Sequence, residues 1–292
     1  MIDLHMHTTY TDGTCSVSEL LSQAETKGLT LISITDHDCV NAYDELANPE
    51  TRKLFSGKII TGVELGCKFG NLQMEILAYG LDPNKIKSHC ENYTQYKYNT
   101  FVNRKFIDKM KEFGFQIENV DITKHCSNLL NRWLVEYKDF FDSINPNFTK
   151  DFMCLYRAFT NPNSPLCISF DEFYKSADEI IELIRKCGGL AFLSHPAEYK
   201  ENKETMLEYF KDKVDGIECF HTSCDKEYSQ YLVQFAQKNN LLISGGSDFH
   251  GKVKPNFELG LVAHGEMIVP NELLEWTNNI QNYKAIEETQ EK

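Results

Sequence analysis

The sequence lacks the features that would place it outside a reducing compartment or in a membrane. Its ten cysteines are scattered, without CxxC pairs or zinc-finger spacing, so they indicate neither a disulfide framework nor a structural zinc clip. It contains no stretch of about 20 apolar residues, and its first residues do not read as a signal peptide. We therefore expect a cytoplasmic protein that does not bind a membrane.

Positive charge is also scarce. The 292 residues include 30 Lys and Arg against 43 Asp and Glu, which gives a formal net charge of -13. This balance argues against a broad basic surface, and so against binding of long duplex nucleic acid. A small anionic substrate is compatible with it, because bound metal ions can reverse the charge locally.

Apolar runs alternate with helical patterns at both ends of the chain, which is typical of α/β proteins with a parallel sheet. After a first run at residues 2–4, we expect strands at residues 29–34, 59–63, 73–79, 190–193, 215–220, 241–244 and 259–262. Capping boxes at residues 16–19 and 176–179 open two of the helices between them. From about residue 83 to 175 strand signals fade and aromatic residues increase. We expect one domain of residues 1–82 and 176–292, and an inserted, mostly helical subdomain of residues 83–175.

Most histidines lie at or just after the end of an expected strand, the edge at which active sites of parallel α/β proteins assemble. They are His5, His7, His37, His195, His221 and His250, accompanied by Asp12, Glu64 and Asp248. His and carboxylate ligands without Cys favour an open catalytic site for Zn, Mn, Fe or Mg. Because these ligands exceed what one ion can use, we expect two to three divalent metal ions that share a carboxylate.

These motifs resemble those of the PHP (polymerase and histidinol phosphatase) family of metal-dependent phosphoesterases. The matching residues are His-x-His at 5–7, Asp12, Thr-Asp-His-Asp at 35–38, Gly-Val-Glu at 62–64, Ser-His-Pro at 194–196 and Gly-Ser-Asp-Phe-His at 246–250. The resemblance covers roughly residues 1–82 and 176–265. It implies a distorted seven-stranded β/α barrel that is interrupted by the helical insertion and holds up to three metal ions.

The resemblance also implies how the ligands are shared. One ion would bind His5, His7, Glu64 and Asp248, a second Glu64 and His195, and a third Asp12, His37 and His250. The sequence departs from the family at Glu75, where the family commonly has histidine. We expect Glu75 to complete the second site and to favour harder ions such as Mn or Mg, because carboxylate is a suitable ligand for them. The alternative is a weak or empty second site.

The implied activity is hydrolysis of a phosphate ester, with in-line attack on phosphorus by a hydroxide that bridges two metal ions. Asp12 and His250 belong to the catalytic centre. His221 is the candidate for phosphate contact or general acid, unless it only orients a neighbour. Basic side chains of the insertion are candidates for phosphate binding, unless they are ordinary solvated charges; they are Arg104, Arg157 and Lys175.

We expect a small phosphorylated substrate. Stand-alone bacterial members of the family with this insertion suggest a nucleoside 3',5'-bisphosphate or the 5' end of a short oligonucleotide. Aromatic side chains of the insertion could stack on bases or form their own core; they include Tyr93, Tyr96, Tyr98, Phe101 and Trp133. Two alternatives stay open: a histidinol-phosphate-type phosphatase, and a non-catalytic metal-binding regulatory module in which Glu75 marks a degenerate site.

Overall fold

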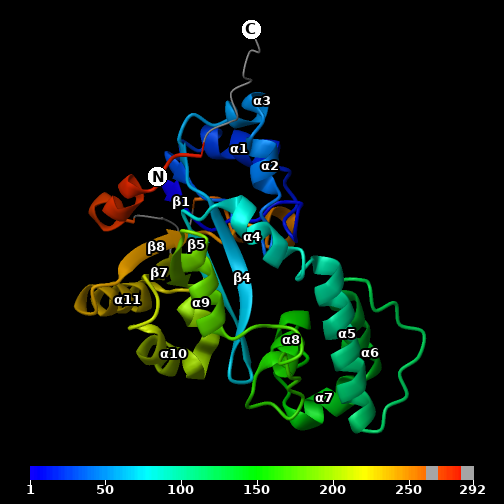
Figure 1. Ribbon diagram of the computed structural model, residues 1–292. Helices are drawn as coiled ribbons and strands as arrows, with labels where there is room; N and C mark the ends of the chain where they lie inside the picture. The colour runs from blue at the N-terminus through cyan, green and yellow to red at the C-terminus, as the bar shows by residue number, and fades with distance from the viewer. Residues whose placement is uncertain (261–268, 284–292) are drawn as a thin grey trace. The chain divides into compact units, whose positions relative to one another are not determined.

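The computed structural model describes residues 1–260 and 269–283 (Figure 1). Helices and strands of two sheets follow one another along the chain, which confirms the predicted α/β class. The expected strand at residues 259–262 lies partly outside the described residues. No helix in the described part of the chain is long and apolar enough to cross a membrane.

The first sheet consists of three short parallel strands in the order β1-β2-β3. They are β1 (Ile2–Asp3), β2 (Leu31–Ile32) and β3 (Lys58–Ile59), and the connecting helices are α1 (Val17–Thr26), α2 (Ala42–Leu46) and α3 (Pro49–Arg52). The predicted capping box begins α1, because the Glu19 N–H donates to Ser16 Oγ over 3.3 Å and the Ser16 N–H donates to Glu19 Oε2 over 2.8 Å. Helical connections of this kind allow neighbouring strands to run parallel.

The second sheet has five strands, in chain order from β4 to β8. They are β4 (Gly62–Phe69), β5 (Leu72–Tyr79), β6 (Leu190–Leu193), β7 (Gly216–His221) and β8 (Leu242–Gly246). β6, β7 and β8 run parallel, whereas β5 and β6 are antiparallel, which departs from the parallel sheet that the sequence predicts. The reason is the link between β4 and β5: it consists of Gly70 and Asn71 alone, so β5 must run back along β4.

The apolar run at residues 59–63 was expected to form one strand that ends at Glu64, and this expectation is wrong. β3 ends at Ile59, and β4 begins at Gly62 and continues to Phe69. Glu64 is therefore the third residue of β4 and not its end. Buried Leu65 and Cys67 continue the strand beyond the apolar run that marks it in the sequence.

Contacts divide the chain into two compact units. The first contains Met1–Leu65, Glu75–Glu91 and Asp178–Lys292, and the second contains Gly66–Met74 and Asn92–Ala177. The second unit thus includes the tip of the β4–β5 hairpin, which the predicted subdomain 83–175 leaves out. The predicted division into domains stays a prediction.

Helices of the first unit follow its strands. They are α4 (Pro83–Cys90), α9 (Ala177–Lys186), α10 (Lys203–Phe210) and α11 (Lys226–Lys238), with 3-10 helices η1 (Pro196–Asn202), η2 (Gly251–Val253) and η3 (Asn271–Asn279). α11 packs against β7 and β8 (Figure 1). Apolar side chains from both sheets form one buried cluster, which includes Leu4, Leu77 and Phe192. This core holds the strands whose ends carry the predicted ligands.

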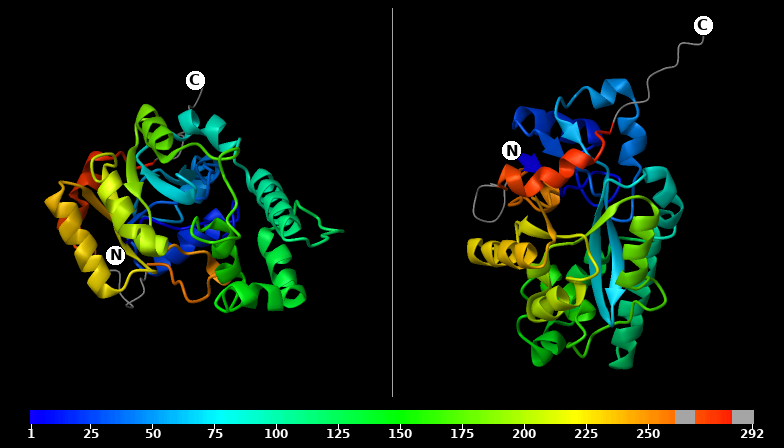
Figure 2. Two further views of the ribbon diagram at one scale, coloured as in Figure 1. Left: turned by 90° about the horizontal axis from the view of Figure 1, so that it is seen from below. Right: turned by 60° about the vertical axis from the view of Figure 1, so that its left-hand side comes forward.

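The second unit contains four helices that lie together in both views of Figure 2. They are α5 (Gln95–Glu112), α6 (Cys126–Glu136), α7 (Lys138–Ile144) and α8 (Phe152–Thr160). Trp133 is fully buried among them, and Tyr93, Tyr98 and Phe101 pack against the same core. The sequence left two roles open for these aromatic side chains, base stacking and core formation. The structure places these four in or against the core. Tyr96 differs, because it is 63% exposed.

Candidate metal centre

His5 and His7 lie on the segment that follows β1. Residues alternate sides along an extended chain, so the sequence predicts that the two imidazoles share one face. Their ring centroids are 5.2 Å apart, and both side chains are fully buried. Gly246 at the end of β8 permits the close approach, because a Cβ atom at Gly246 would lie only 2.2 Å from the His5 Cβ. A glycine here thus lets β8 end directly against the His5 backbone.

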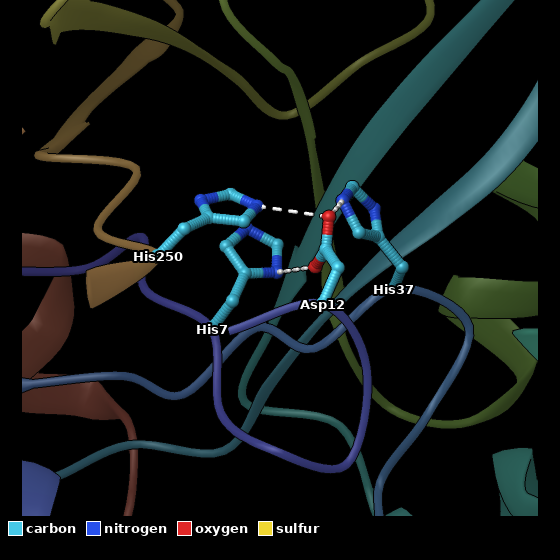
Figure 3. A group of neighbouring side chains, drawn as sticks. All are labelled: His7, Asp12, His37 and His250. Carbon is cyan, nitrogen blue, oxygen red and sulfur yellow. Dashed lines mark ion pairs between the residues drawn. The ribbon is translucent and has the colours of Figure 1, made fainter. Parts of the chain in front are cut away.

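Asp12 lies among three imidazoles (Figure 3). Its Oδ2 is 3.2 Å from His250 Nε2 and 3.7 Å from His37 Nε2, and its Oδ1 is 3.9 Å from His7 Nδ1. The three imidazoles come from segments that follow β1, β2 and β8, so one carboxylate meets the ends of three strands. This set matches the implied third site, with His7 added.

The loop that carries Asp12 is held by the buried carboxylate of Asp36. Asp36 Oδ1 accepts hydrogen bonds from the Thr8 N–H and the Thr11 hydroxyl, both over 2.7 Å. Asp36 Oδ2 accepts a third from the Thr8 hydroxyl over 2.7 Å. Buried polar groups usually find such partners, and here they fix the turn just before Asp12.

Glu64 lies where two groups of imidazoles meet, and its side chain is 1% exposed. Its Oε2 is 3.1 Å from His37 Nδ1, 3.2 Å from His5 Nε2 and 3.5 Å from His7 Nε2. Its Oε1 is 3.0 Å from His195 Nε2. The two oxygens thus face different histidines, which is the arrangement expected of a carboxylate shared between two ions.

Glu75 reaches the same centre from the interior of β5. Its Oε2 is 3.2 Å from His195 Nε2, and its Oε1 is 3.6 Å from His37 Nδ1. The backbone holds Glu75 in place, because its N–H donates to the Tyr199 hydroxyl over 3.2 Å. The Glu75 carboxylate therefore lies beside His195, another ligand proposed for the second site.

Asp248 completes the centre at the end of β8. Its Oδ1 is 3.1 Å from His7 Nε2 and 3.5 Å from His5 Nε2. Both Asp248 and His195 have left-handed backbone conformations, with φ values of +55° and +29°. Such backbones cost free energy in residues other than glycine and are concentrated at functional sites.

Several groups of ligand atoms among the described residues lie within 4.8 Å of one another, close enough to share an ion. The groups are His7, Asp12, His37 and His250; His5, His7 and Glu64; His37, Glu64 and Glu75; and His5, Glu218 and His221. The first three correspond in large part to the sets that the resemblance implies. The fourth group was not predicted as a metal site. Its hydrogen bonds, described next, indicate that Glu218 and His221 are not metal ligands.

Hydrogen-bond acceptors outside the metal centre determine which ring nitrogen of His5 and of His250 faces the centre. The His5 Nδ1–H donates to Glu218 Oε1 over 2.9 Å, and the His250 Nδ1–H donates to the Asp248 carbonyl over 2.8 Å. The Nε2 atoms of both rings then face the carboxylates of the centre. Metal-bound histidines commonly donate their other N–H to such an acceptor. Glu218 also accepts the His195 N–H on Oε2 over 2.7 Å, so it holds two predicted ligands at once.

His221 has the opposite arrangement. Its Nδ1 accepts the backbone N–H of Ser223 over 3.0 Å. Because a backbone N–H can only donate, this Nδ1 carries no proton and the Nε2 of the neutral ring must carry it. His221 Nε2 lies 3.5 Å from Asp248 Oδ2. The ring is thus arranged as a hydrogen-bond donor and not as a metal ligand.

The electrostatics of the centre keep its carboxylates ionised. Burial opposes the charged forms, but the imidazoles of His5 and His37 hold the pKa of Glu64 well below its usual range. Burial together with the neighbouring imidazoles of His250 and His37 lowers the pKa of His7 to about 3, so His7 is neutral at pH 7. For His37 burial lowers the pKa, yet Asp12 and Glu64 outweigh it and raise the value to about 9. In the metal-free protein, protonated imidazoles such as that of His37 thus balance the negative charge of the carboxylates. Bound cations could do the same.

The centre fits divalent cations by a further test. Among the predicted metal ligands, the buried side-chain atoms that find no hydrogen-bond partner in the described part of the chain are His7 Nδ1 and Nε2, Asp12 Oδ1, His195 Nδ1 and His250 Nε2. Buried polar atoms without partners are costly and rare in folded proteins. Here they belong to imidazole and carboxylate side chains, which are the ligand types that divalent metals use in such centres.

The three predicted phosphate-binding cations all belong to the second unit. Arg104 is exposed on α5, Arg157 lies on α8, and Lys175 is exposed and precedes α9. Their role stays a prediction. The sequence reasoning missed Lys254, whose Nζ lies 2.6 Å from Asp248 Oδ2 within the centre. The only feature of the sequence that marks Lys254 is its place as the second basic residue shortly after the motif at residues 246–250.

A cluster of histidines and carboxylates at the strand ends of an α/β fold is typical of metal-dependent hydrolases. The PHP domain family model matches residues 3–232 of this sequence. The chain therefore belongs to the PHP domain family, which confirms the resemblance and implies divalent metal ions.

Relatives of nearly the full length have low sequence identity. The chain is 24% identical to a 3',5'-nucleoside bisphosphate phosphatase of Chromobacterium violaceum over 92% of its own length and 93% of the relative. It is 23% identical to a phosphoribosyl 1,2-cyclic phosphate 1,2-diphosphodiesterase of Eggerthella lenta, over 92% and 98%. It is 24% identical to a 5'-3' exoribonuclease of Haemophilus influenzae, over 85% and 89%.

Solved structures share the fold. A Bifidobacterium adolescentis chain described as a metal-dependent phosphoesterase aligns with a TM-score of 0.63 at 22% identity, over 94% of this chain and 95% of that one. A Chromobacterium violaceum chain described as an amidohydrolase aligns with a TM-score of 0.67 at 22% identity, over 97% and 98%.

Proposed function

We propose that this protein hydrolyses a phosphate ester of a small nucleotide-type substrate, a nucleoside 3',5'-bisphosphate or the 5' end of a short oligonucleotide. The observation that carries the proposal is Glu64, whose two oxygens face separate groups of histidines in one buried centre. The predicted class of enzyme, a hydrolase and metal-dependent phosphoesterase, is confirmed by the relatives, which are named as phosphatases, phosphodiesterases and exoribonucleases. The particular substrate is our proposal.

We assign the ligands to two or three ions. Glu64 and Asp248 would hold the first ion with His5 and His7. Glu64 and Glu75 would hold the second with His195, and the remaining set is Asp12, His37 and His250. When bound, such ions supply positive charge to phosphoryl oxygens and lower the pKa of water. Because the ligands are imidazole and carboxylate, Mn, Zn, Fe and Mg all suit them.

The chain's own residues have distinct parts in the proposed reaction. Asp12 and His250 are the proposed catalytic residues, and they lie together, with Asp12 Oδ2 3.2 Å from His250 Nε2. The loop that carries Asp12 is fixed by the hydrogen bonds of Asp36. His221 offers its Nε2–H as a donor, which suits contact with a phosphoryl oxygen better than metal ligation. Because Nε2 is the only ring nitrogen free to donate, we favour phosphate contact over proton transfer for His221.

The charge distribution is compatible with a short polyanion. The second unit has 12 Lys and Arg against 10 Asp and Glu, whereas the rest of the chain has 18 against 33. We propose that basic residues of the second unit contact phosphate; the candidates are Arg104, Arg157 and Lys175. A long nucleic acid would need an extended track of positive charge, which an acidic first unit does not offer.

We also propose that the two sheets belong to one distorted seven-stranded barrel. β3 and β4 are consecutive strands with two residues between them, so the seven-strand count treats them as two parts of one interrupted barrel strand. The Leu4 N–H donates to the Gly245 carbonyl over 3.1 Å, which links the first strand to β8. The Asp38 N–H donates to the Glu64 carbonyl over 2.8 Å, which links the segment after β2 to β4. Such links between neighbouring strands are what barrel closure requires.

A reducing cytoplasm is the proposed location. All ten cysteines are free thiols. A secreted protein with this many cysteines would usually form disulfides.

The test is a phosphate-release panel with the protein loaded in turn with Mn, Zn, Fe and Mg. The panel contains a nucleoside 3',5'-bisphosphate, a 5'-phosphorylated dinucleotide, a long duplex and histidinol phosphate. We expect the highest kcat/KM for one of the first two. His7→Ala and Asp248→Asn should each lower kcat by about 100-fold or more, because each removes a group from the proposed metal centre. Turnover at the wild-type rate in either variant would refute the assignment, and preference for histidinol phosphate would support that alternative instead.

A further inference from the structure

The two oxygens of Asp248 have different surroundings. Oδ1 faces the histidines of the metal centre, with His7 Nε2 at 3.1 Å. Oδ2 faces two hydrogen-bond donors: Lys254 Nζ at 2.6 Å and His221 Nε2 at 3.5 Å. One carboxylate therefore separates a group of metal ligands from a pair of donors.

Lys254 is the donor that reaches the solvent, whereas His221 is fully buried. The Lys254 side chain is 34% exposed, whereas the Asp248 side chain beside it is 6% exposed. A bound anion can therefore reach the ammonium without entering the buried ligand cluster. Lys254 lies in the segment after η2, six residues beyond Asp248, and belongs to the first unit together with the whole centre.

The number of available protons supports a further ligand. An ammonium group has three N–H donors. Among the described residues, Lys254 Nζ donates to Asp248 Oδ2, and this bond uses one of the three. His221 Nε2 must carry its proton because Nδ1 accepts the Ser223 N–H, and Nε2 finds no hydrogen-bond partner among the residues that the structure describes. Toward the described residues, Lys254 thus has two unused donors, and the single Nε2–H of His221 lies beside the same oxygen of Asp248.

We propose that Lys254 and His221 together bind an oxygen of the substrate phosphoryl group beside Asp248. This inference rests on the proposed function and names the residues of the first unit that hold its phosphate. A phosphoryl group has several acceptor oxygens, so it can accept from both donors while Lys254 keeps its bond to Asp248. Lys254 is then a substrate-binding residue that adds positive charge next to the metal ions. The rival role is a positioning residue that only orients Asp248 for a metal.

The experiment measures phosphate and metal binding separately. Lys254→Met removes the charge and keeps the length of the side chain, and Lys252→Met in the same segment is the matched control, because Lys252 is exposed. Each protein is loaded with Mn, its metal content is measured by mass spectrometry, and inorganic phosphate is titrated calorimetrically. We expect the phosphate Kd of Lys254→Met to rise by about 10-fold or more, because charge-assisted hydrogen bonds are lost. Metal content should equal that of the wild type, and Lys252→Met should change neither quantity.

Further readouts distinguish the two roles. In turnover, Lys254→Met should raise KM more than it lowers kcat, and Lys254→Arg should recover part of the loss. Lost metal equivalents with unchanged phosphate affinity per metal-loaded protein would overturn the inference in favour of positioning. An unchanged phosphate Kd, or no phosphate binding by the wild type, would also overturn it. If thermal unfolding shows that Lys254→Met does not fold, Lys254→Gln takes its place. If the wild type hydrolyses no ester, the proposed function fails, while the phosphate titration still decides the role of Lys254.

Discussion

Glu218 allows a quantitative test of how the centre is held. Its side chain is fully buried, and its two oxygens accept hydrogen bonds from His5 Nδ1–H at 2.9 Å and from the His195 N–H at 2.7 Å. Glu218→Gln keeps the size of the side chain but leaves one acceptor oxygen and introduces an NH2 group that can only donate. Either one of the two donors then loses its acceptor, or His5 moves its proton to Nε2, the nitrogen that faces the metal centre. A buried donor without a partner costs about 1–3 kcal/mol.

Two consequences follow for Glu218→Gln. The free energy of unfolding of the metal-free protein should fall by about 1–3 kcal/mol in urea titrations. Metal affinity should fall by about 10–100-fold, the usual effect of removing the partner of a metal-bound histidine. Calorimetric titration of the EDTA-treated protein with Mn measures the affinity. Glu227→Gln on α11 is the control, because it makes the same change of charge at an exposed position.

A specific result would refute this reasoning. If Glu218→Gln binds Mn within twofold of the wild-type affinity and unfolds at the same urea concentration, then the contacts of Glu218 with His5 and His195 do not hold the ligands. An equal loss of affinity in Glu227→Gln would show that net charge alone is responsible. Turnover is not needed for either conclusion.

Two other predictions concern single residues of the centre. Glu75→Gln should lower metal content by about one equivalent in mass spectrometry of the loaded protein, because the amide is a poorer ligand; unchanged content would favour the empty second site. The pKa of His37 is raised from 6.5 to about 9 by Asp12 and Glu64 against the effect of burial. The stabilisation from this charged imidazole is present in full below pH 6.5 and is lost as the pH rises through about 9. The metal-free protein should therefore unfold at progressively lower urea concentration over this range, whereas its metal affinity should rise, since the ion displaces the proton. A flat stability profile, or one that His37→Gln leaves unchanged, would contradict this assignment.

The sequence was sufficient to predict the class of the fold and the residues that meet in the centre. His5 and His7 could be placed on one face because side chains alternate along an extended chain. His195 and Asp248 could be brought to the same edge because each follows an apolar run, and parallel strands end together. These inferences depend on periodicity and chain direction, which are visible in a single sequence.

Other features depend on contacts without a periodic signal. The position of Glu64 inside β4 follows from pairing beyond the apolar run, and the reversed direction of β5 follows from a two-residue turn. Lys254 lies in an irregular segment, where spacing says nothing about the direction of a side chain. Its ion pair with Asp248 appears only once the backbone after β8 has been placed.

The left-handed backbones of His195 and Asp248 restrict how this enzyme could change its metal preference during evolution. Asparagine, aspartate, histidine and glycine tolerate such backbones best, so glutamate or cysteine at either position would combine a new ligand with added strain. Glu75 has no such restriction, because it lies on a regular strand. Exchange between oxygen and nitrogen ligands is therefore least costly at Glu75, and related chains adapted to different ions should vary there first.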